Sequence, residues 1–354
     1  MMKIILNGIG CPDSGARLIL SQLLKSLPED IHLLAFVPRI NKKDTYDNCN
    51  KNIRCILLNV KYWSLYLRPL LEIIVNVVKI VFRYNGIINI SNHGLCLTKN
   101  QLLYIQNQYI LDLTAEKKLG GGYPNAITRF GLNTFIKHAE TICVQSFHIQ
   151  ALLKEYCQNS KVNYPKNVVV IRPLPLFNNY EQKKTDKTFE FQFFYPASDF
   201  KHKRISLAID SITEYAKMNN RVGLEITSKR LGGVCEFVSY LDQIPYDEVI
   251  SRMNSSNAII FTSEREALGL PLLEALNFEK PAVLPKLPYA VEIYGDAGVY
   301  FEKPEIASIV KALNFLYENY NEYCDRVKER KKTEWSNRKS WQNHWEIFCD
   351  QLKK

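Results

Sequence analysis

SEREALGLPLLEALNFEKPAVLPKLPYAVEIYGDAGVYFE, residues Ser263–Glu302, is the most informative stretch of the chain. It follows a short apolar run, Ala258–Phe261, that predicts a strand, and Gly269, Leu270 and Pro271 then predict the start of a helix. Proline at a first helical position loses no hydrogen bond, and glycine before it lets the backbone approach a ligand closely. The free N–H groups of this helix start would favour an anion such as a diphosphate.

Two glutamates flank the predicted turn, Glu266 in the loop and Glu274 in the helix. Glu274 is close enough to the helix start for its two oxygens to accept hydrogen bonds from both hydroxyls of a ribose. In the alternative interpretation, Glu274 only complements the helix dipole and Glu266 is a solvated loop residue. Residue types and spacing alone leave both interpretations open.

The first half of the chain alternates short β-rich runs with segments of helical periodicity, which indicates β-α-β units and a parallel sheet. The predicted strands there are Lys3–Asn7, His32–Val37, Ile53–Asn59, Ile87–Ile90, Leu102–Gln106, Ile142–Val144 and Val168–Ile171. Helical spacing predicts helices over Ala16–Ser26 and Ile127–Ala139. This pattern is typical of a doubly wound α/β domain.

The periodicity stops over Pro173–Thr188, where prolines, paired asparagines and a charged cluster indicate a linker. The alternation then resumes. The predicted strands are Phe189–Tyr195, Val222–Thr227, Cys235–Val238, Ala258–Phe261 and Ala282–Leu284, and the predicted helices are Ile205–Met218, Tyr246–Asn254, Pro271–Asn277 and Glu305–Tyr317. Two such domains predict a central cleft, with ligands at the carboxyl ends of the strands.

Composition indicates a globular protein, because 46% of the 354 residues are hydrophobic and 23% are charged. Nine cysteines, an odd number without a Cys-x-x-Cys pair, are interpreted as reduced thiols of a cytoplasmic protein, and the six histidines lack the helical spacing of a zinc site. The net charge of +10 has three possible explanations: the protein binds nucleic acid, it binds an anionic membrane surface, or its basic surface is solvated and has no partner.

The segment Trp63–Phe82 is apolar except for Arg68, Glu72, Asn76 and Lys79, which share one stripe of a helix. Charges at mid-span are costly in lipid, which argues against a transmembrane helix. We expect a helix buried in the first domain with this stripe as its one wet edge. The alternative is a helix that lies on a membrane surface.

Residues Ser263–Gly298 resemble the signature region of retaining GT-B glycosyltransferases of family 4. The residues that fit are Ser263, Glu266, Gly269, Leu270, Pro271, Glu274, Ala275, Pro281, Glu292, Gly295, Asp296 and Gly298. Ala267 and Leu268 depart from the family pattern, which has glycine and phenylalanine there, and this affects the expected choice of donor more than the fold.

A second segment, Pro196–Ile212, resembles the strand, loop and helix in which this family places an arginine and a lysine on the nucleotide diphosphate. Lys203 fits the lysine. The arginine position falls on Ser198, so Lys201 or Arg204 would supply the missing charge. Without the resemblance, a solvated basic helix start would explain the cluster equally well.

The resemblance also reaches the first half of the chain. The turn GIGCPDSGARL fits the family's first loop and assigns Gly15, next to Ser14, to the donor phosphate. The strand and loop after Leu102 resemble the acceptor region, with Gln106 and Asn107 where many members have histidine and His93 as a substitute. Lys118 and Arg129 are further candidates for acceptor contacts.

The implied organisation is an acceptor-binding Rossmann-like domain over residues 1–175, a linker over 176–188 and a nucleotide-sugar-binding Rossmann-like domain over 189–335. Residues 336–354 would form a helix that crosses back onto the first domain. The family's first domain binds the acceptor and its second binds the donor.

The resemblance implies transfer of a sugar from a nucleotide diphosphate sugar to a hydroxyl with retention of configuration. Lys203 and the helix start would stabilise the diphosphate, Glu266 the transferred sugar and Glu274 the ribose. No cofactor or metal is expected, in keeping with the lack of an Asp-x-Asp sequence.

The expected acceptor is a polyprenyl-linked saccharide of O-antigen, lipopolysaccharide or capsule assembly, met at the inner face of the plasma membrane. The protein would then be cytoplasmic and peripheral on an anionic membrane surface. A soluble glycosyltransferase with a small acceptor is the alternative. A nucleic-acid-binding protein is less favoured, because no basic stretch is interleaved with aromatic residues in a known module.

Overall fold

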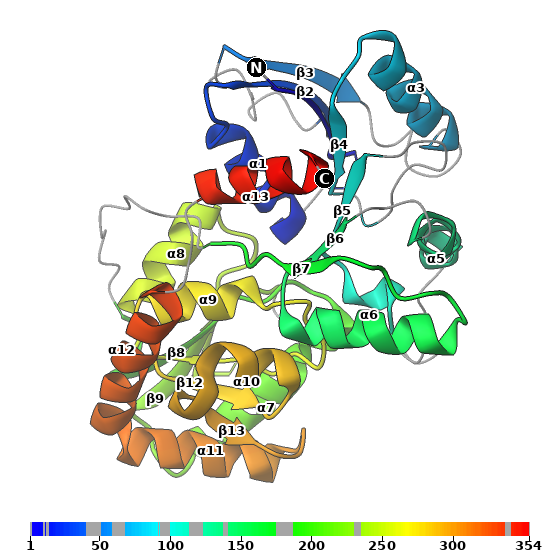
Figure 1. Cartoon of the computed structure of the whole chain (residues 1–354). Helices are drawn as coiled ribbons and strands as arrows, with labels where there is room; N and C mark the ends of the chain where they lie inside the picture. The colour runs from blue at the N-terminus through cyan, green and yellow to red at the C-terminus, as the bar shows by residue number, and fades with distance from the viewer. Residues whose placement is uncertain are drawn as a thin grey trace. The chain divides into compact units, whose positions relative to one another are not determined.

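The computed structural model describes residues 2–9, 11, 14–39, 51–58, 68–90, 92, 100–112, 123–136, 141–174, 187–229, 235–336 and 341–353. The chain divides into two compact units, shown together in Figure 1. Unit 1 consists of Met1–Leu174 and Lys339–Lys354, and unit 2 consists of Pro175–Arg338. Most of the predicted linker, 176–188, and the candidates His93 and Lys118 lie outside the described residues.

Unit 1 is built on a seven-stranded parallel sheet with the strand order β3-β2-β1-β4-β5-β6-β7. The strands are β1 Met2–Asn7, β2 Ile31–Pro38, β3 Ile53–Leu58, β4 Gly86–Asn89, β5 Gln101–Ile105, β6 Thr141–Val144 and β7 Val168–Val170. The helices are α1 Ser14–Lys25, α3 Arg68–Val81, α5 Tyr123–Ile136, α6 Phe147–Asn159 and α13 Trp341–Lys353, with a short 3-10 helix, η2, at Gln108–Ile110.

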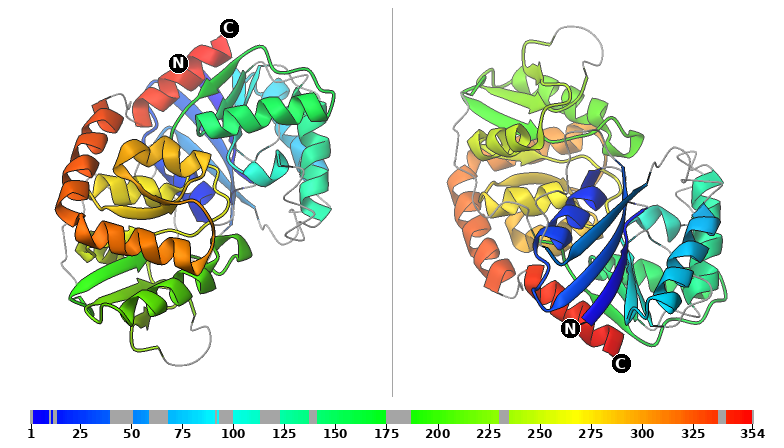
Figure 2. Two further views of the ribbon diagram at one scale, coloured as in Figure 1. Left: turned by 90° about the horizontal axis from the view of Figure 1, so that it is seen from below. Right: turned by 90° about the horizontal axis from the view of Figure 1, so that it is seen from above.

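Helices cover both faces of this sheet because its central strands are apolar on both sides. Ile5 and Ile87, which pair in register, pack with Leu71 and Val75 of α3. The opposite face carries Tyr104, whose ring makes an edge contact with a phenylalanine of α13. Figure 2 shows α3 and α13 on opposite sides of the sheet. The strand order and the two layers of helices are those of a doubly wound fold.

The last helix, α13, belongs to unit 1, as the predicted helix of residues 336–354 required. Trp345 is fully buried, and its indole N–H donates to the carbonyl of Leu23 in α1 at 3.0 Å. Leu352 packs against Gly86, where a side chain on the glycine would come within 2.8 Å of it. These contacts attach the end of the chain to the first unit.

Unit 2 is built on a six-stranded parallel sheet with the strand order β10-β9-β8-β11-β12-β13. The strands are β8 Phe191–Tyr195, β9 Val222–Ile226, β10 Val238–Tyr240, β11 Ala258–Ile260, β12 Ala282–Pro285 and β13 Val299–Phe301. The helices are α7 Ile205–Ala216, α8 Tyr246–Ser255, α9 Leu270–Asn277, α10 Pro288–Tyr294, α11 Ile306–Glu318 and α12 Tyr320–Ser336, with 3-10 turns η3 at Lys201–Lys203 and η4 at Gly295–Ala297.

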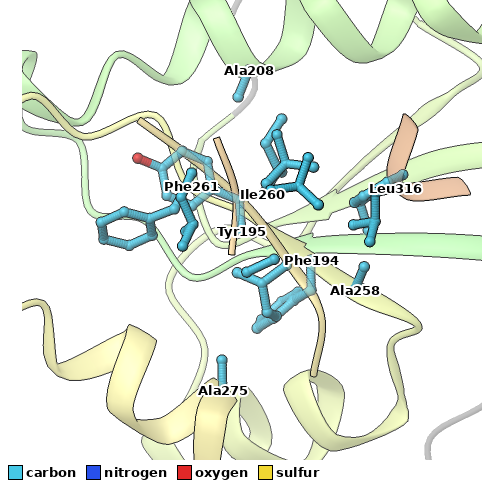
Figure 3. Packing of buried hydrophobic residues seen from close by; sticks show 14 of the residues in the cluster. Phe194, Tyr195, Ala208, Ala258, Ile260, Phe261, Ala275 and Leu316 are labelled. Carbon is cyan, nitrogen blue, oxygen red and sulfur yellow. The ribbon is translucent and has the colours of Figure 1, made fainter. Parts of the chain in front are cut away.

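The core of unit 2 lies around the two central strands. Helices α7 and α11 pack together on one face of the sheet, whereas α9, α10 and α12 pack together on the other. Figure 3 shows Phe194, Tyr195 and Ile260 of β8 and β11 among the buried side chains. The ring of Tyr195 also meets that of Phe261 at 5.4 Å. The two halves confirm the predicted pair of parallel-sheet α/β domains.

The expected orientation of α3 is wrong. Asn76, predicted for the wet edge, is 6% exposed, and Glu72 and Lys79 are only partly exposed, whereas Ile80 is 67% exposed. Periodicity identifies two faces of a helix but does not decide which one meets the sheet. None of the described helices is both long enough and apolar enough to cross a membrane.

We predict that Trp345→Ala lowers the free energy of unfolding of unit 1 by about 3–5 kcal/mol, because it leaves a large cavity and removes the bond to Leu23. Urea denaturation followed by circular dichroism measures this change. Asp350→Ala, on the exposed side of the same helix, is the control and should have little effect. Equal stability of the two variants would contradict the role of Trp345.

Candidate active site

The candidate site lies where the strand order of unit 2 reverses. Strands β8 and β11 are neighbours in the sheet but are separated in sequence, so the loops that follow them leave its carboxyl edge in diverging directions. The loop after β8 carries Lys203, and the loop after β11 carries Glu266. In open α/β sheets, this position is where ligands bind.

Lys203 and Glu266, the two predicted catalytic residues, form an ion pair. The Lys203 Nζ donates to Oε1 of Glu266 at 2.5 Å, and the two side chains are only 11% and 13% exposed. The Nζ also lies 5.2 Å from the ring centroid of Phe261, a cation–π contact. The structure therefore brings together a cation and an anion that 62 intervening residues separate in the chain.

The backbone around Lys203 is fixed by buried hydroxyl groups. Its carbonyl accepts hydrogen bonds from Tyr195 at 2.6 Å and from Thr262 at 2.9 Å. Burial raises the pKa of the Tyr195 phenol, so this group stays a neutral donor. These bonds connect the two loops directly, which holds the ammonium group in one place.

The loop of Glu266 is supported from α10. The buried Tyr289 donates its phenolic hydrogen to the carbonyl of Ser263 at 2.5 Å. Ser263 in turn donates from Oγ to the carbonyl of Arg265 at 3.2 Å. A loop held by such bonds presents its carboxylate with little loss of conformational entropy on binding.

Gly269 ends this loop and is the N-cap of α9. Its φ of +77° is a left-handed conformation that L-residues adopt at a cost, and this explains the glycine. Leu270 and Pro271 form the first turn, and no side chain in the described part of the protein caps it. The N–H groups of Leu272 and Leu273 donate to the carbonyl of Gly269, and the helix dipole makes this end of α9 electropositive.

Glu274 is in the second turn of α9 and is 4% exposed. Its Oε1 accepts a hydrogen bond from the hydroxyl of Tyr246 at 2.5 Å, at the start of α8. Burial raises the pKa of Glu274 to about 7, an effect that the bond from Tyr246 partly offsets. The carboxyl group therefore changes its charge near neutral pH.

Three of the remaining donor candidates, Ser198, Lys201 and Arg204, lie between β8 and α7. Ser198 and Lys201 are exposed. Arg204 has a left-handed φ of 49° and forms an ion pair with Glu264. Gly15 lies in unit 1, half-buried in the first turn of α1.

Sequence reasoning missed two residues near these candidates, His202 and Tyr246. His202 stacks on Phe200 with ring centroids 5.6 Å apart, and its carbonyl accepts from the backbone N–H of Glu264 at 2.8 Å. Burial, together with the charges of Lys203 and Arg265, lowers the pKa of His202 against the opposing effect of Glu266 and Glu264. Tyr246 could have been found as the first residue of a predicted helix at the same edge of the sheet.

Three acceptor candidates of unit 1, Gln106, Asn107 and Arg129, lie in the described part of the chain and form hydrogen bonds in and around the loop after β5. Gln106 is buried, and its Nε2 donates to the carbonyl of Ile90 at 3.3 Å. Asn107 caps η2 by accepting from Tyr109 N at 2.9 Å. Arg129 donates to the carbonyls of Tyr109, Ile110 and Asp112 at 3.0–3.1 Å. These contacts give each residue a local structural role, and the acceptor contact stays a prediction.

Among the described residues, no group of three or more His, Cys, Asp or Glu side chains could hold a metal ion. The cysteines that the structure describes, including Cys143 and Cys349, form no disulfide bonds.

The chain is similar to one protein-family model and to several solved structures. Residues 178–334 match the family model described as glycosyl transferases group 1. No curated protein sequence matches the chain.

Solved structures are similar to the whole chain. A sucrose-phosphate synthase from Thermosynechococcus elongatus has a TM-score of 0.72 at 13% identity, with 100% of this chain and 98% of that chain covered. Anabaena HepE in complex with UDP and glucose has a TM-score of 0.70 at 14% identity, with 99% and 100% covered. WaaG, a glycosyltransferase involved in lipopolysaccharide biosynthesis, has a TM-score of 0.64 at 13% identity, with 96% of each chain covered. At these identities the likeness shows the fold, GT-B.

The raised pKa of Glu274 predicts a pH-dependent stability. Between about pH 4.5 and 7 the folded protein keeps a proton that the unfolded chain releases, so the stability contributed by this group falls as the pH rises. Relative to Glu274→Gln, the unfolding free energy of the natural protein should fall by about 3 kcal/mol across this range.

Urea denaturation at several pH values measures this difference, and Glu236→Gln is the control for loss of an exposed carboxylate. A difference between the natural protein and Glu274→Gln that does not vary with pH would contradict the raised pKa.

Proposed function

We propose that this protein is a glycosyltransferase that moves a sugar from a nucleotide diphosphate sugar to a hydroxyl group with retention of configuration. The observation that carries the proposal is the buried pair of Lys203 and Glu266 at the reversal of strand order. It lies within residues 178–334, the part that matches the glycosyltransferase family model.

The chemical difficulty is a leaving group that takes negative charge with it. A fixed ammonium group and the start of α9 would stabilise the developing charge on the diphosphate. Lys203 supplies the first and Gly269 with Leu270 the second, and Ser198, Lys201, Arg204 and Gly15 are further donor-binding candidates. Donor binding would transfer the ammonium group of Lys203 from the carboxylate of Glu266 to a phosphate.

The glutamates would then hold hydroxyl groups. Glu266 would accept hydrogen bonds from the transferred sugar, and Glu274 from both ribose hydroxyls. In its ionised form Glu274 accepts more such bonds, so a bound ribose favours loss of its proton. With attack on the same face of the sugar, the departing phosphate would accept the proton of the acceptor hydroxyl, and no covalent nucleophile is assigned.

The acceptor proposed is a polyprenyl-linked saccharide of O-antigen, lipopolysaccharide or capsule assembly, at the inner face of a bacterial plasma membrane. The net charge of +10 supports an anionic partner of this kind. Gln106, Asn107 and Arg129, with His93 and Lys118 outside the described residues, are its candidate contacts. A small soluble acceptor is the second candidate, favoured by the similarity to a sucrose-phosphate synthase fold.

A thermal-shift screen with UDP, GDP, dTDP and CMP identifies the donor nucleotide, since a ligand that binds only the folded state raises the melting temperature. Turnover is then measured with the matching donor. A screen in which no nucleotide raises the melting temperature would contradict the proposed function.

We predict that Lys203→Ala lowers kcat by on the order of a hundredfold, because one fixed charge at the leaving group is lost. Lys217→Ala removes an exposed lysine that pairs with Glu214 on α7 and is the matched control. Both proteins are first compared by thermal melting to show that they are folded. A folded Lys203→Ala variant with normal kcat would exclude the lysine from the reaction.

We predict that a chelator leaves the rate unchanged, because Lys203 and the start of α9 perform the charge stabilisation that a divalent ion would otherwise provide. The rate is measured with purified enzyme before and after treatment with EDTA, and again after addition of Mg²⁺. Loss of activity with EDTA and recovery with Mg²⁺ would contradict the metal-independent mechanism.

A further inference from the structure

Helix α3 presents an apolar face to solvent. Its residues Leu70, Ile73, Ile74, Val77, Ile80 and Val81, here named the α3 outer face, recur at spacings of three and four and are 38–67% exposed. Phe82, which follows, is 61% exposed. Leu71 and Val75 on the other side of the helix are buried against the sheet. Figure 1 shows α3 along the outer side of unit 1.

This arrangement is unfavourable for a protein that meets only water. Single exposed apolar residues are common, but a continuous face of them is not. The same helix buries Asn76, whose Oδ1 has no hydrogen-bond partner in the described part of the protein, while Ile80 faces outward. A polar group inward and aliphatic groups outward indicate that a partner covers the outer face.

The charge of the chain is concentrated in the unit that carries α3. Unit 1 has 24 Lys and Arg against 12 Asp and Glu, a net charge of +12, whereas unit 2 has 22 against 24, a net charge of −2. Arg83, just beyond the helix, is exposed. An anionic partner is therefore favoured, and a second copy of unit 1 on the same face is disfavoured by repulsion.

We propose that the α3 outer face docks on an anionic lipid bilayer. The aliphatic side chains would enter the boundary between headgroups and acyl chains, and basic residues of unit 1 would meet the headgroups. The proposal rests on the proposed function in one respect only: docking on the membrane would bring the enzyme to a lipid-linked acceptor. Its evidence, the exposure of α3 and the charge of unit 1, is independent of the donor site.

The test is flotation of the full chain with vesicles of phosphatidylglycerol and phosphatidylcholine, compared with vesicles of phosphatidylcholine alone. The variant Ile73→Ser/Val77→Ser/Ile80→Ser removes apolar surface from three exposed positions, so folding is preserved. Phe130→Ser, an exposed apolar residue on α5 of the same unit, is the matched control. We expect the natural protein and the control to float with anionic vesicles, and the triple variant to bind them at least roughly tenfold more weakly.

Three results would overturn the proposal. They are equal binding by the triple variant and the control, binding that does not depend on anionic lipid, and a dimer in light scattering that the triple variant abolishes without any vesicle binding. A thermal shift with the donor nucleotide is measured on the same samples. Because α3 is outside the donor site, a triple variant that loses vesicles but keeps the thermal shift separates this proposal from the proposed function.

Discussion

The ion pair between Lys203 and Glu266 is the interaction on which the candidate active site depends. A pair this deeply buried adds little net stability, because removing two charges from water costs about as much as their attraction returns. Its role is to fix the positions of the two charged side chains. Adjacent parallel strands β8 and β11 deliver the two residues to one edge of the sheet, and the hydroxyls of Tyr195 and Thr262 fix the lysine backbone there.

The side chains around this pair are held by contacts within the protein. Tyr289 supports the Glu266 loop, Gly269 sets the direction of α9, and Tyr246 holds Glu274. Groups that are already oriented need no reorganisation when charge develops, and electrostatic stabilisation of a transition state depends on this. The buried carboxyl of Glu274, with its pKa of about 7, is the part of the site that responds most to pH.

The fold class could be read from the sequence because short apolar runs alternate with amphipathic helices in both halves. Helices α6 and α10 and strand β13 were not predicted; α10 and β13 are short, with seven and three residues. Glu266 and Lys203 were predicted from local motifs. Tyr246 was missed, since its role depends on how α8 packs against α9, and α3 was oriented wrongly because periodicity does not say which face is covered.

The most direct test of the central claim is a crystal structure of the protein with the nucleoside diphosphate that it binds. We predict that the Nζ of Lys203 has left Glu266 and lies within hydrogen-bonding distance of the diphosphate, which occupies the start of α9, with the ribose on Glu274. A diphosphate bound elsewhere, with the Lys203–Glu266 pair intact, would contradict it.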